Sequence, residues 1–315
     1  MKRNWGKIRR FIPMYLMLLP GLVYLFINNY MPMAGIIIAF KKYNYSLGIF
    51  KSPFTGLKNF EFLFKTKDAW TITRNTLGYN IIFIVLGTVL AIAVDLTSQY
   101  ETLMAILLNE IRSTMGKKVY QTLILVPFLI SIVVVSYLVY GFLSTDAGFI
   151  NNSILKPMGK EAIGWYSNAK YWPFILIFVN IWKNLGYNCI IYYATVVGLD
   201  ASLYESASID GANRWQRIVH ITLPGLKTTI ITLTLMSVGR IFYSDFGLFY
   251  QVPMNSGPLI DVTNTIDTYV YRGLMELNNI GMASAAGLYQ SLVGFALVLI
   301  ANLIVRRLDE NSALF

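Results

Sequence analysis

The sequence predicts an all-α integral membrane protein with about six transmembrane helices, and three observations support this fold class. Hydrophobic residues make up 56% of the 315 residues and charged residues only 13%, whereas soluble domains usually carry about 25% charged residues. The mean hydropathy is +0.54. A bilayer core of about 30 Å needs roughly 20 apolar residues per helix, and about six such runs fit between the polar loops. Because lipid offers no partners for backbone polar groups and the runs are too long for barrel strands, helices are expected.

The first span is expected within residues 11–40, after a basic segment at residues 1–10. A basic start before an apolar run is typical of a secretory signal peptide, but this run is long and has no small-residue cleavage site. We therefore interpret it as an uncleaved span, which its three prolines bend or delimit. A polar loop, residues 41–73, follows.

The next three spans are separated by polar and aromatic segments. The second begins near Asn75 with NTLGYNIIFIVLGTVLAIAV, and the third covers residues 119–143. The loop at residues 144–170 ends in GWYSNAKYW, whose aromatic residues suit the membrane–water boundary. The fourth span is expected at residues 171–199.

Two further spans complete the expected membrane domain. The fifth, residues 224–250, starts with a proline, whose missing N–H has no partner in a first helical turn anyway. The sixth is expected at residues 283–305, before a short tail at residues 306–315. Since the chain has no internal repeat, a single membrane domain over residues 11–305 is the simplest organisation.

The net charge of +10 is better explained by membrane orientation than by nucleic-acid binding, because the charges lie in loops and at the ends of apolar runs. Five basic residues in the first ten, and the pair Arg306–Arg307 beside the last span, favour a cytoplasmic location for both termini. Seven basic residues between Lys41 and Arg74 oppose this orientation, so charge alone decides it only in part.

Metal and redox chemistry have little support in the sequence. Cys189 is the only cysteine, which excludes an internal disulfide and argues against a cysteine-based metal site. His220 is the only histidine, and neither HExxH nor CxxC occurs. We therefore predict no metal site and no catalytic residues in this chain.

The segment YESASIDGANRWQRIVHITLP, residues 204–224, differs from the spans on both sides because it contains acids, arginines and the only histidine. Ser202 and Glu205 have the spacing of a capping box, which satisfies free N–H groups at a helix start. Gly211 is expected to stop this helix, since glycine accepts a left-handed backbone. The segment therefore begins as a short capped helix.

A second short helix is expected after the glycine. Asn213 and Gln216 repeat the capping pattern, and Leu223, which precedes a proline, is expected to be extended and to end the helix. The hairpin should expose three large side chains: Tyr204, Ile209 and Trp215. It could be an interfacial loop whose apolar residues dip into lipid, or a docking element for a soluble partner.

The same segment resembles a known motif. Glu205-Ser206-Ala207, then Gly211 after three residues and Ile221-Thr222-Leu223-Pro224 after nine more, is similar to the EAA motif, E-A-A-x3-G-x9-I-x-L-P, of bacterial ABC importer permeases. The departure is Ser206 in place of the middle alanine. The stretches LPGLVYLFINNYMPM, DGANRWQRIVHITLPG and IDTYVYRGL resemble the maltose-type branch, and most closely its permeases for polysaccharide or complex-sugar uptake.

This resemblance implies that residues 200–224 form a cytoplasmic coupling loop that fits a cleft on a separate ATPase subunit. It implies that Glu205 pairs with a basic residue there and that Gly211 makes the turn. The coupling residues expected from the motif and its surroundings are Tyr204, Glu205, Ser206, Ala207, Ile209, Asp210, Gly211, Ala212, Ile221, Leu223 and Pro224.

The resemblance also implies the remaining parts of the transporter. A second homologous permease, two copies of a cytoplasmic ATPase that bind ATP and Mg, and an extracellular substrate-binding lipoprotein are expected. The chain has no G-x-x-x-x-G-K-[ST] phosphate loop, so we expect a transport subunit without its own ATPase site. It would be a multi-pass protein of the bacterial plasma membrane that moves an oligosaccharide or complex sugar.

Two other classes of function are alternatives to this one. An ion-coupled secondary carrier of a small polar solute should have inverted repeats and buried acids, and the sequence has neither a repeat nor a convincing chain of acids within the spans. A membrane glycosyl- or phosphotransferase should have a convergent acid or metal cluster, whereas Asp261 and Asp267 are scattered loop acids.

Polar residues within the spans are the candidates for a substrate path, because such residues are costly in lipid and tend to face a cavity or one another. Three asparagines recur every four residues in the fourth span and share one helical face. The candidates are Asn180, Asn184, Tyr187, Asn188, Arg240, Tyr243 and Gln290. The alternative is that they join helices, with Arg240 paired to an acid such as Asp245.

One segment departs from the pattern of this branch. About ten extra residues, Asp95 to Met104, separate the second span from the sequence LLNEIRS. The segment could continue the span, kink it, or lie along the membrane surface.

Overall fold

The computed structural model describes residues 2–98 and 114–308 of the chain. The segment from Asp95 to Met104 therefore lies largely outside the described residues, except that the second long helix continues to Ser98. Within the described ranges the chain is helical and forms no named strand, which confirms the all-α prediction. It divides into two compact units, residues 1–66 with 270–289 and residues 67–269 with 290–315.

The first unit contains the N-terminal span and a folded connector. Residues 11–40 form one candidate span of mixed helix types. The elements are α1 (Lys2–Leu25), η1 (Phe26–Tyr30), η2 (Met31–Phe40), α2 (Gly48–Lys51), η3 (Gly56–Phe60) and α3 (Phe62–Lys65), with the end of α13 (Ile266–Met275) and the start of α14 (Ile280–Leu308).

The second unit is built from long helices. Its longest elements are α4 (Lys67–Ser98), α6 (Thr114–Leu129), α7 (Ile132–Leu143), α8 (Trp172–Val197), α11 (Leu223–Gly239) and most of α14. The shorter elements are η4 (Ile150–Leu155), η5 (Trp165–Ser167), η6 (Ala169–Tyr171), α9 (Ala201–Ile209), α10 (Arg214–Arg217), η7 (Ile218–Thr222), η8 (Gly247–Gln251), η9 (Gly257–Leu259) and α12 (Ile260–Thr263). Within this unit, α4 and α6 both pack against α8.

Five described helices are long and apolar enough to cross a membrane, and a bent pair makes a sixth if it is counted as one span. This agrees with the prediction of about six. Three boundaries differ by more than a few residues from the expected ones: the second span begins at Lys67, and the fifth begins at Trp215 and ends at Gly239. The acidic Asp68 in the first turn of α4 favours an earlier start, since it faces the positive end of the helix dipole.

The third span is broken rather than straight. Its two parts, α6 and α7, meet at an angle of 95°. Ser131 has an extended backbone at the break, and its hydroxyl oxygen accepts a hydrogen bond from the N–H of Val133 at 3.4 Å, so it caps α7. The prediction of one continuous span over residues 119–143 is therefore wrong.

The fifth span is also broken, at residues 240–245, before the chain continues into η8. Side chains from two other helices satisfy the exposed backbone there. The amide Nδ2 of Asn80 in α4 donates to the carbonyls of Ile241 and Tyr243 at 2.8 and 3.0 Å, and Gln290 in α14 donates to that of Phe242 at 2.7 Å. Such partners are required because lipid supplies none.

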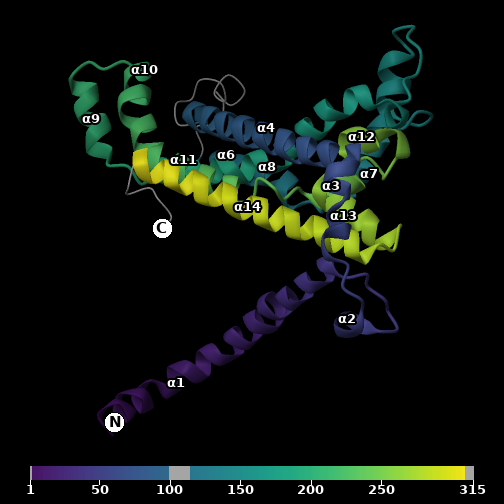
Figure 1. Cartoon of the computed structure of the whole chain (residues 1–315). Coiled ribbons are helices and arrows are strands. Elements are labelled where there is room, and N and C mark those ends of the chain that lie inside the picture. Colours follow the sequence, from purple (N-terminus) through teal and green to yellow (C-terminus); the bar gives the residue numbers. More distant parts are fainter. Residues whose placement is uncertain (1, 99–113, 309–315) are drawn as a thin grey trace. The chain divides into compact units, whose positions relative to one another are not determined.

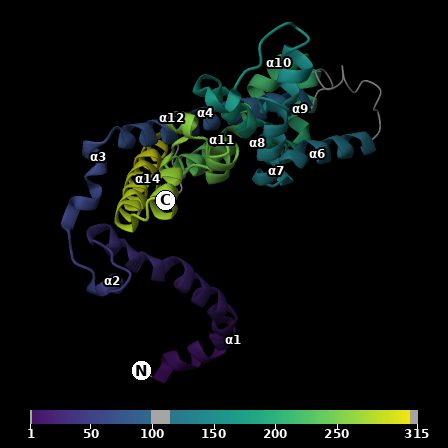
Figure 2. The ribbon, with the colours of Figure 1, turned by 90° about the vertical axis from the view of Figure 1, so that its right-hand side faces the viewer.

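Two apolar clusters hold the second unit together. One contains Trp172 and Leu176 of α8 together with Phe249 of η8. The other lies around Cys189 and Tyr192 of α8 and Leu226 of α11. In Figure 1 the hairpin of α9 and α10 stands at one end of this unit, and α12 lies toward the other; Figure 2 also shows α12 apart from the hairpin. The hairpin is therefore held on the end of a packed helical scaffold.

Candidate functional site

The hairpin between α8 and α11 starts with a capped helix, but the cap is not the expected one. Helix α9 begins at Ala201, and Asp200 is its N-cap: the carboxylate accepts a hydrogen bond from the N–H of Ser202 at 2.9 Å. Ser202 is therefore inside the helix, and the predicted capping box with Glu205 is wrong. A charged carboxylate at the positive end of the helix is a stronger acceptor than the serine hydroxyl. The same hydrogen bond lowers the pKa of Asp200.

Replacing Asp200 by alanine should fray the first turn of α9, because the N–H of Ser202 loses its acceptor. Hydrogen exchange at the Ser202 amide should become faster, whereas Asp200→Ser, which keeps an oxygen acceptor, should exchange like the parent. Acidification should act like the alanine variant. Since folding lowers the pKa of this carboxyl, its stabilisation is present above the ordinary aspartate pKa and is lost as the pH falls through the lowered value. Equal exchange in the two variants would contradict the cap.

The turn after α9 depends on Gly211, as predicted. Its φ of +77° is in the left-handed region. The N–H of Gly211 bonds to the carbonyl of Ser208 at 3.2 Å, and that of Ala212 bonds to the carbonyl of Ala207 at 2.8 Å. These two bonds form a Schellman motif, in which glycine is the usual residue because a Cβ would be strained. The hairpin turn is thus fixed by local backbone chemistry.

The second helix of the hairpin has the predicted cap but not the predicted end. Asn213 and Gln216 cap each other: Asn213 N–H donates to Oε1 of Gln216 at 2.8 Å, and Gln216 N–H donates to Oδ1 of Asn213 at 2.9 Å. Leu223, expected to be extended, is helical with φ −63° and ψ −43°. The π-type turn of η7 places the N–H of Leu223 on the carbonyl of Ile218, five residues back, and this wider turn gives the proline ring room. The helix therefore continues from α10 into α11.

The large side chains of the hairpin divide into two groups. Ile209 and Trp215 are 86% and 71% exposed, as predicted. Tyr204 is half-buried instead, because its hydroxyl bonds to that of Thr222 at 2.9 Å and turns the ring back onto the second helix. Arg217 adds another tie between the helices, from its Nη1 to the hydroxyl of Ser208 at 3.0 Å. The hairpin is thus internally braced while it presents an apolar tip.

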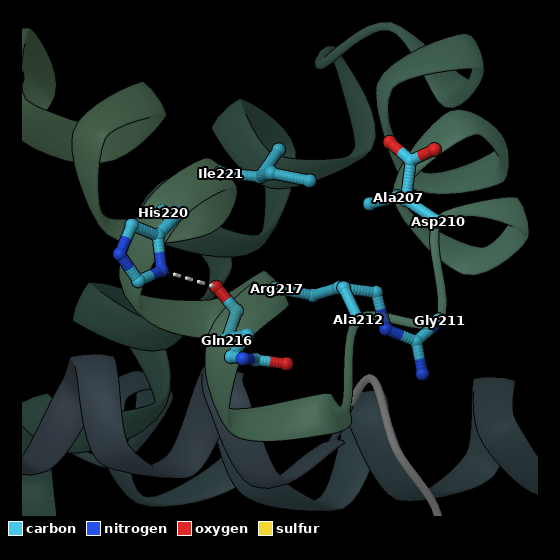
Figure 3. Close-up of a pocket in the computed structure, with 8 residues that line it drawn as sticks. All are labelled: Ala207, Asp210, Gly211, Ala212, Gln216, Arg217, His220 and Ile221. Carbon is cyan, nitrogen blue, oxygen red and sulfur yellow. Dashed lines mark hydrogen bonds between the residues drawn. The ribbon is translucent and has the colours of Figure 1, made fainter.

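A hollow of about 350 Å³ opens between the two arms of the hairpin (Figure 3). Its lining residues are Ala207, Asp210, Gly211, Ala212, Gln216, Arg217, His220 and Ile221. In Figure 3 the guanidinium of Arg217 extends toward the Gly211 turn, and Nδ1 of His220 lies 3.0 Å from the carbonyl of Gln216. Five of the eleven predicted coupling residues therefore gather around one opening.

The other predicted coupling residues lie outside the hollow. Glu205 and Ser206 are exposed on α9, and in the described part of the chain Glu205 forms no ion pair. Leu223 and Pro224 begin α11, with Pro224 exposed. The motif thus forms one connected surface that includes the outer face of α9, the turn, and the start of α11.

The predicted substrate-path residues of α8 are arranged along one side of the helix. Asn180, Asn184 and Asn188 are all half-buried. The Nδ2 of Asn184 bonds within its own helix, to the carbonyl of Asn180 at 3.0 Å. Asn188 lies against Gly87 of α4, so it faces a neighbouring helix. Their common face is confirmed, whereas substrate contact stays a prediction.

Tyr187 belongs to a group of aromatic and cationic side chains that could not be predicted from the sequence. Its ring stacks on Phe128 of α6 with centroids 4.6 Å apart, and it is 47% exposed. One turn earlier in α8, Nζ of Lys183 donates to the carbonyls of Phe128 and Ile130 at 3.0 and 2.6 Å and to that of Pro127 at 3.3 Å. A lysine inside an apolar span is costly unless it has such partners, and this cost was the signal in the sequence that pointed to Lys183.

The remaining path candidates surround the break in the fifth span. Arg240 and Tyr243 are exposed there, and Arg240 forms no ion pair with Asp245 among the described residues. Oδ1 of Asp245 instead accepts from the N–H of Leu248 at 3.1 Å. Gln290 is buried and also donates to the carboxylate of Asp267 at 3.1 Å. Arg240 and Tyr243 therefore lie at the surface of this chain, and their contact with a solute stays a prediction, whereas Gln290 bonds to the broken backbone.

No group of three or more His, Cys, Asp and Glu side chains that could hold a metal ion occurs in the described ranges. The polar groups described above are side-chain amides, exposed aromatic rings and cationic side chains. This arrangement suits the recognition of a polar solute or a protein surface.

Comparison with known proteins identifies relatives over nearly the whole chain. Residues 101–310 match the family described as binding-protein-dependent transport system inner membrane component. Protein LplB of Bacillus subtilis (strain 168) is 34% identical over 301 residues, which cover 95% of this chain and 90% of the relative. The polygalacturonan/rhamnogalacturonan transport system permease protein YteP of the same strain is 34% identical, with 95% and 89% covered.

Solved structures are similar over the same extent. A bacterial ABC transporter involved in the import of the acidic polysaccharide alginate has a chain that is 32% identical, with a TM-score of 0.84 over 98% of this chain and 99% of that one. A second structure, of the alginate transporter in complex with an alginate pentasaccharide-bound periplasmic protein, gives a TM-score of 0.83 at 32% identity.

Proposed function

Because the chain belongs to the family of binding-protein-dependent transport system inner membrane components, it is the permease subunit of an ABC importer, and we propose that its hairpin couples transport to a separate ATPase. It is a multi-pass protein of the plasma membrane, and it imports an oligosaccharide or complex sugar. The ATPase of such importers is a separate subunit. The observation that carries the coupling proposal is the braced hairpin at one end of the second unit, with its exposed apolar tip.

The proposed coupling surface consists of the outer face of α9, the Gly211 turn and the hollow beside it. A lever must be stiff to transmit motion, and this hairpin is held by a Schellman turn, a capping box and the bond between Tyr204 and Thr222. Glu205 would pair with a basic residue of the ATPase. Since an exposed ion pair contributes roughly 1 kcal/mol or less, apolar contacts of Ile209 are proposed to supply at least as much of the binding.

The proposed assembly contains a second homologous permease, two copies of a cytoplasmic ATPase that bind ATP and Mg, and an extracellular substrate-binding lipoprotein. The relative crystallised with a pentasaccharide-bound periplasmic protein supports the last of these. In this assembly the hairpin and both termini of the chain face the cytoplasm. The basic residues at the N-terminus and beside the last span support this orientation.

The proposed substrate path runs beside the two broken spans. Tyr187, Arg240 and Tyr243 are exposed at or near the breaks, and irregular backbone at membrane depth occurs where it is buried in protein or lines a water-filled cavity. The asparagine face of α8 would contribute amide groups. We propose that Arg240 favours sugars that carry a carboxylate, and the relatives named for alginate and polygalacturonan transport support this choice.

Gly211→Ala is expected to leave the protein inserted but to reduce ATP-dependent uptake of sugar by about tenfold. Alanine in a left-handed conformation costs roughly 1–2 kcal/mol, and about 1.4 kcal/mol changes the population of the docked hairpin tenfold. Uptake by proteoliposomes that contain the complete importer measures this effect.

Gly159→Ala is a matched control. Gly159 also has a positive φ, +69°, and neither glycine has an atom within 4 Å of an added Cβ. The strain is therefore similar, but Gly159 lies in the loop between α7 and α8, and its variant should transport normally. Equal uptake by the two variants would contradict coupling through the hairpin, and uptake by the chain without any ATPase would favour an ion-coupled carrier.

A further inference from the structure

The connector after the first span is a folded platform, which we define as residues 41–65. Lys41 is 9% exposed, and its Nζ donates to the carbonyls of Ile49 and Phe50 at 3.0 and 2.7 Å. Nδ2 of Asn59 donates to the carbonyls of Ala39 and Lys41, both at 2.9 Å. These bonds cross the connector from end to end, so its surface residues are displayed by a built scaffold.

The surface of this platform combines large apolar side chains with lysines. Three apolar–lysine pairs occur at a spacing of seven residues: Phe50–Lys51, Leu57–Lys58 and Phe64–Lys65. Phe50, Leu57 and Phe64 are 83%, 69% and 87% exposed. Phenylalanine side chains this exposed on an ordered scaffold are expected at a surface that meets lipid or another molecule.

The position of the platform in the chain favours lipid as the partner. It begins directly after the candidate span that ends at Phe40, and the next candidate span begins two residues after it, at Lys67. Within the first unit, the ring of Phe40 packs against those of Phe54 and Phe60, with centroids 6.5 and 5.4 Å apart. The platform is therefore held against the end of a span, where acyl chains meet headgroups.

Its charge favours anionic headgroups. Residues 41–65 contain five lysines and one acid, Glu61, which is a net charge of +4. Lys65 pairs with Glu61 at 2.6 Å, while Lys42, Lys51 and Lys58 are exposed. Apolar residues beside cations are the composition of segments that lie in a membrane interface.

We propose that this platform is a membrane-interface anchor: Phe50, Leu57 and Phe64 enter the lipid interface while the adjacent lysines bind the phosphate groups of anionic lipids. This role accounts for the basic residues that oppose the orientation favoured by both ends of the chain. It depends neither on the sugar nor on the coupling hairpin.

Spin labels can test the anchor in the full-length permease subunits of the importer, from which the ATPase has been removed. The background variant is Cys189→Ser, which removes the only cysteine. Single cysteines then replace Phe50 or Phe64. The control is a cysteine in place of Ile209, which is equally exposed but lies on the hairpin. The importer without bound ATPase is placed in nanodiscs of phosphatidylcholine with or without phosphatidylglycerol. Compared with the label at position 209, the labels at positions 50 and 64 should be less accessible to a water-soluble nickel complex and more accessible to oxygen, which dissolves in lipid. This difference should be larger with phosphatidylglycerol, and Lys51→Gln with Lys58→Gln should remove that increase.

Three results would overturn the proposal. Labels at positions 50 and 64 that are as open to the nickel complex as the control would exclude insertion in lipid. A difference that is unaffected by phosphatidylglycerol would exclude the headgroup contact. Protection that appears only when the sugar-loaded substrate-binding protein is added would assign the surface to a protein partner.

Discussion

Replacing Gly186 by alanine is expected to force α6 and α8 apart and to destabilise the second unit. A Cβ at this position would lie 2.0 Å from the carbonyl oxygen of Ile124 and 2.7 Å from its carbonyl carbon. These are backbone atoms of α6, so they cannot move aside as the end of a flexible side chain can. The helices pack closely here because glycine has no side chain.

The expected loss in the free energy of unfolding follows from two opposing effects. Overpacking typically costs about 1–3 kcal/mol and occasionally more, while alanine gains up to about 1 kcal/mol over glycine in helix propensity. Since both helix backbones must shift, we expect overpacking to prevail, with a net loss of about 2 kcal/mol or more. The Tm of the purified permease should fall, and sugar uptake should fall with it, because Lys183 and Tyr187 on the same helix lose their partner Phe128 on α6.

Gly141→Ala provides the control for Gly186→Ala. Gly141 is in α7, and nothing lies within 4 Å of an added Cβ there. Its variant should have the parent's Tm or a slightly higher one, because only the gain in helix propensity remains. A Gly186→Ala protein as stable as Gly141→Ala would show that α6 and α8 are not closely packed at this position.

The features that could be predicted from the sequence are those whose chemistry is local. The Gly211 turn and the mutual cap of Asn213 and Gln216 each depend on residues within a few positions of one another. The spans follow in the same way from long apolar runs. Local rules also failed at Ser202, where Asp200 is the stronger acceptor for the first turn of α9.

The breaks in the third and fifth spans could not be predicted, because the groups that make them tolerable are distant in sequence. Asn80 bonds to carbonyls 161 and 163 residues away, and Lys183 bonds to carbonyls 53 to 56 residues away. Apolar composition alone is compatible with straight helices. The burial of Tyr204 could not be predicted for a similar reason: its partner, Thr222, is 18 residues further on, across the hairpin.

Lys183→Met is expected to destabilise the break between α6 and α7. In a continuous helix the carbonyls of Pro127, Phe128 and Ile130 would bond to N–H groups four residues on, but the chain turns away there, and the ammonium of Lys183 is their partner instead. Methionine keeps much of the side-chain volume and removes the donor. An acceptor left unsatisfied away from water costs about 1–3 kcal/mol. The bonds to Pro127 and Ile130 are partly buried, so the Tm of the purified permease should fall.

Two further variants distinguish the hydrogen bonds of the Lys183 ammonium from the effect on the Tm of removing a positive charge. Lys160→Met removes an exposed loop lysine and should leave the Tm unchanged. Lys183→Arg keeps the donors but spreads them over a planar fork, which fits three converging carbonyls less well than an ammonium, so it should recover only part of the Tm. If Lys183→Met were as stable as Lys160→Met, the carbonyls at the break would have to be satisfied by water. Water would then reach the backbone at the break between α6 and α7, and the ammonium of Lys183 would be available to bind the sugar.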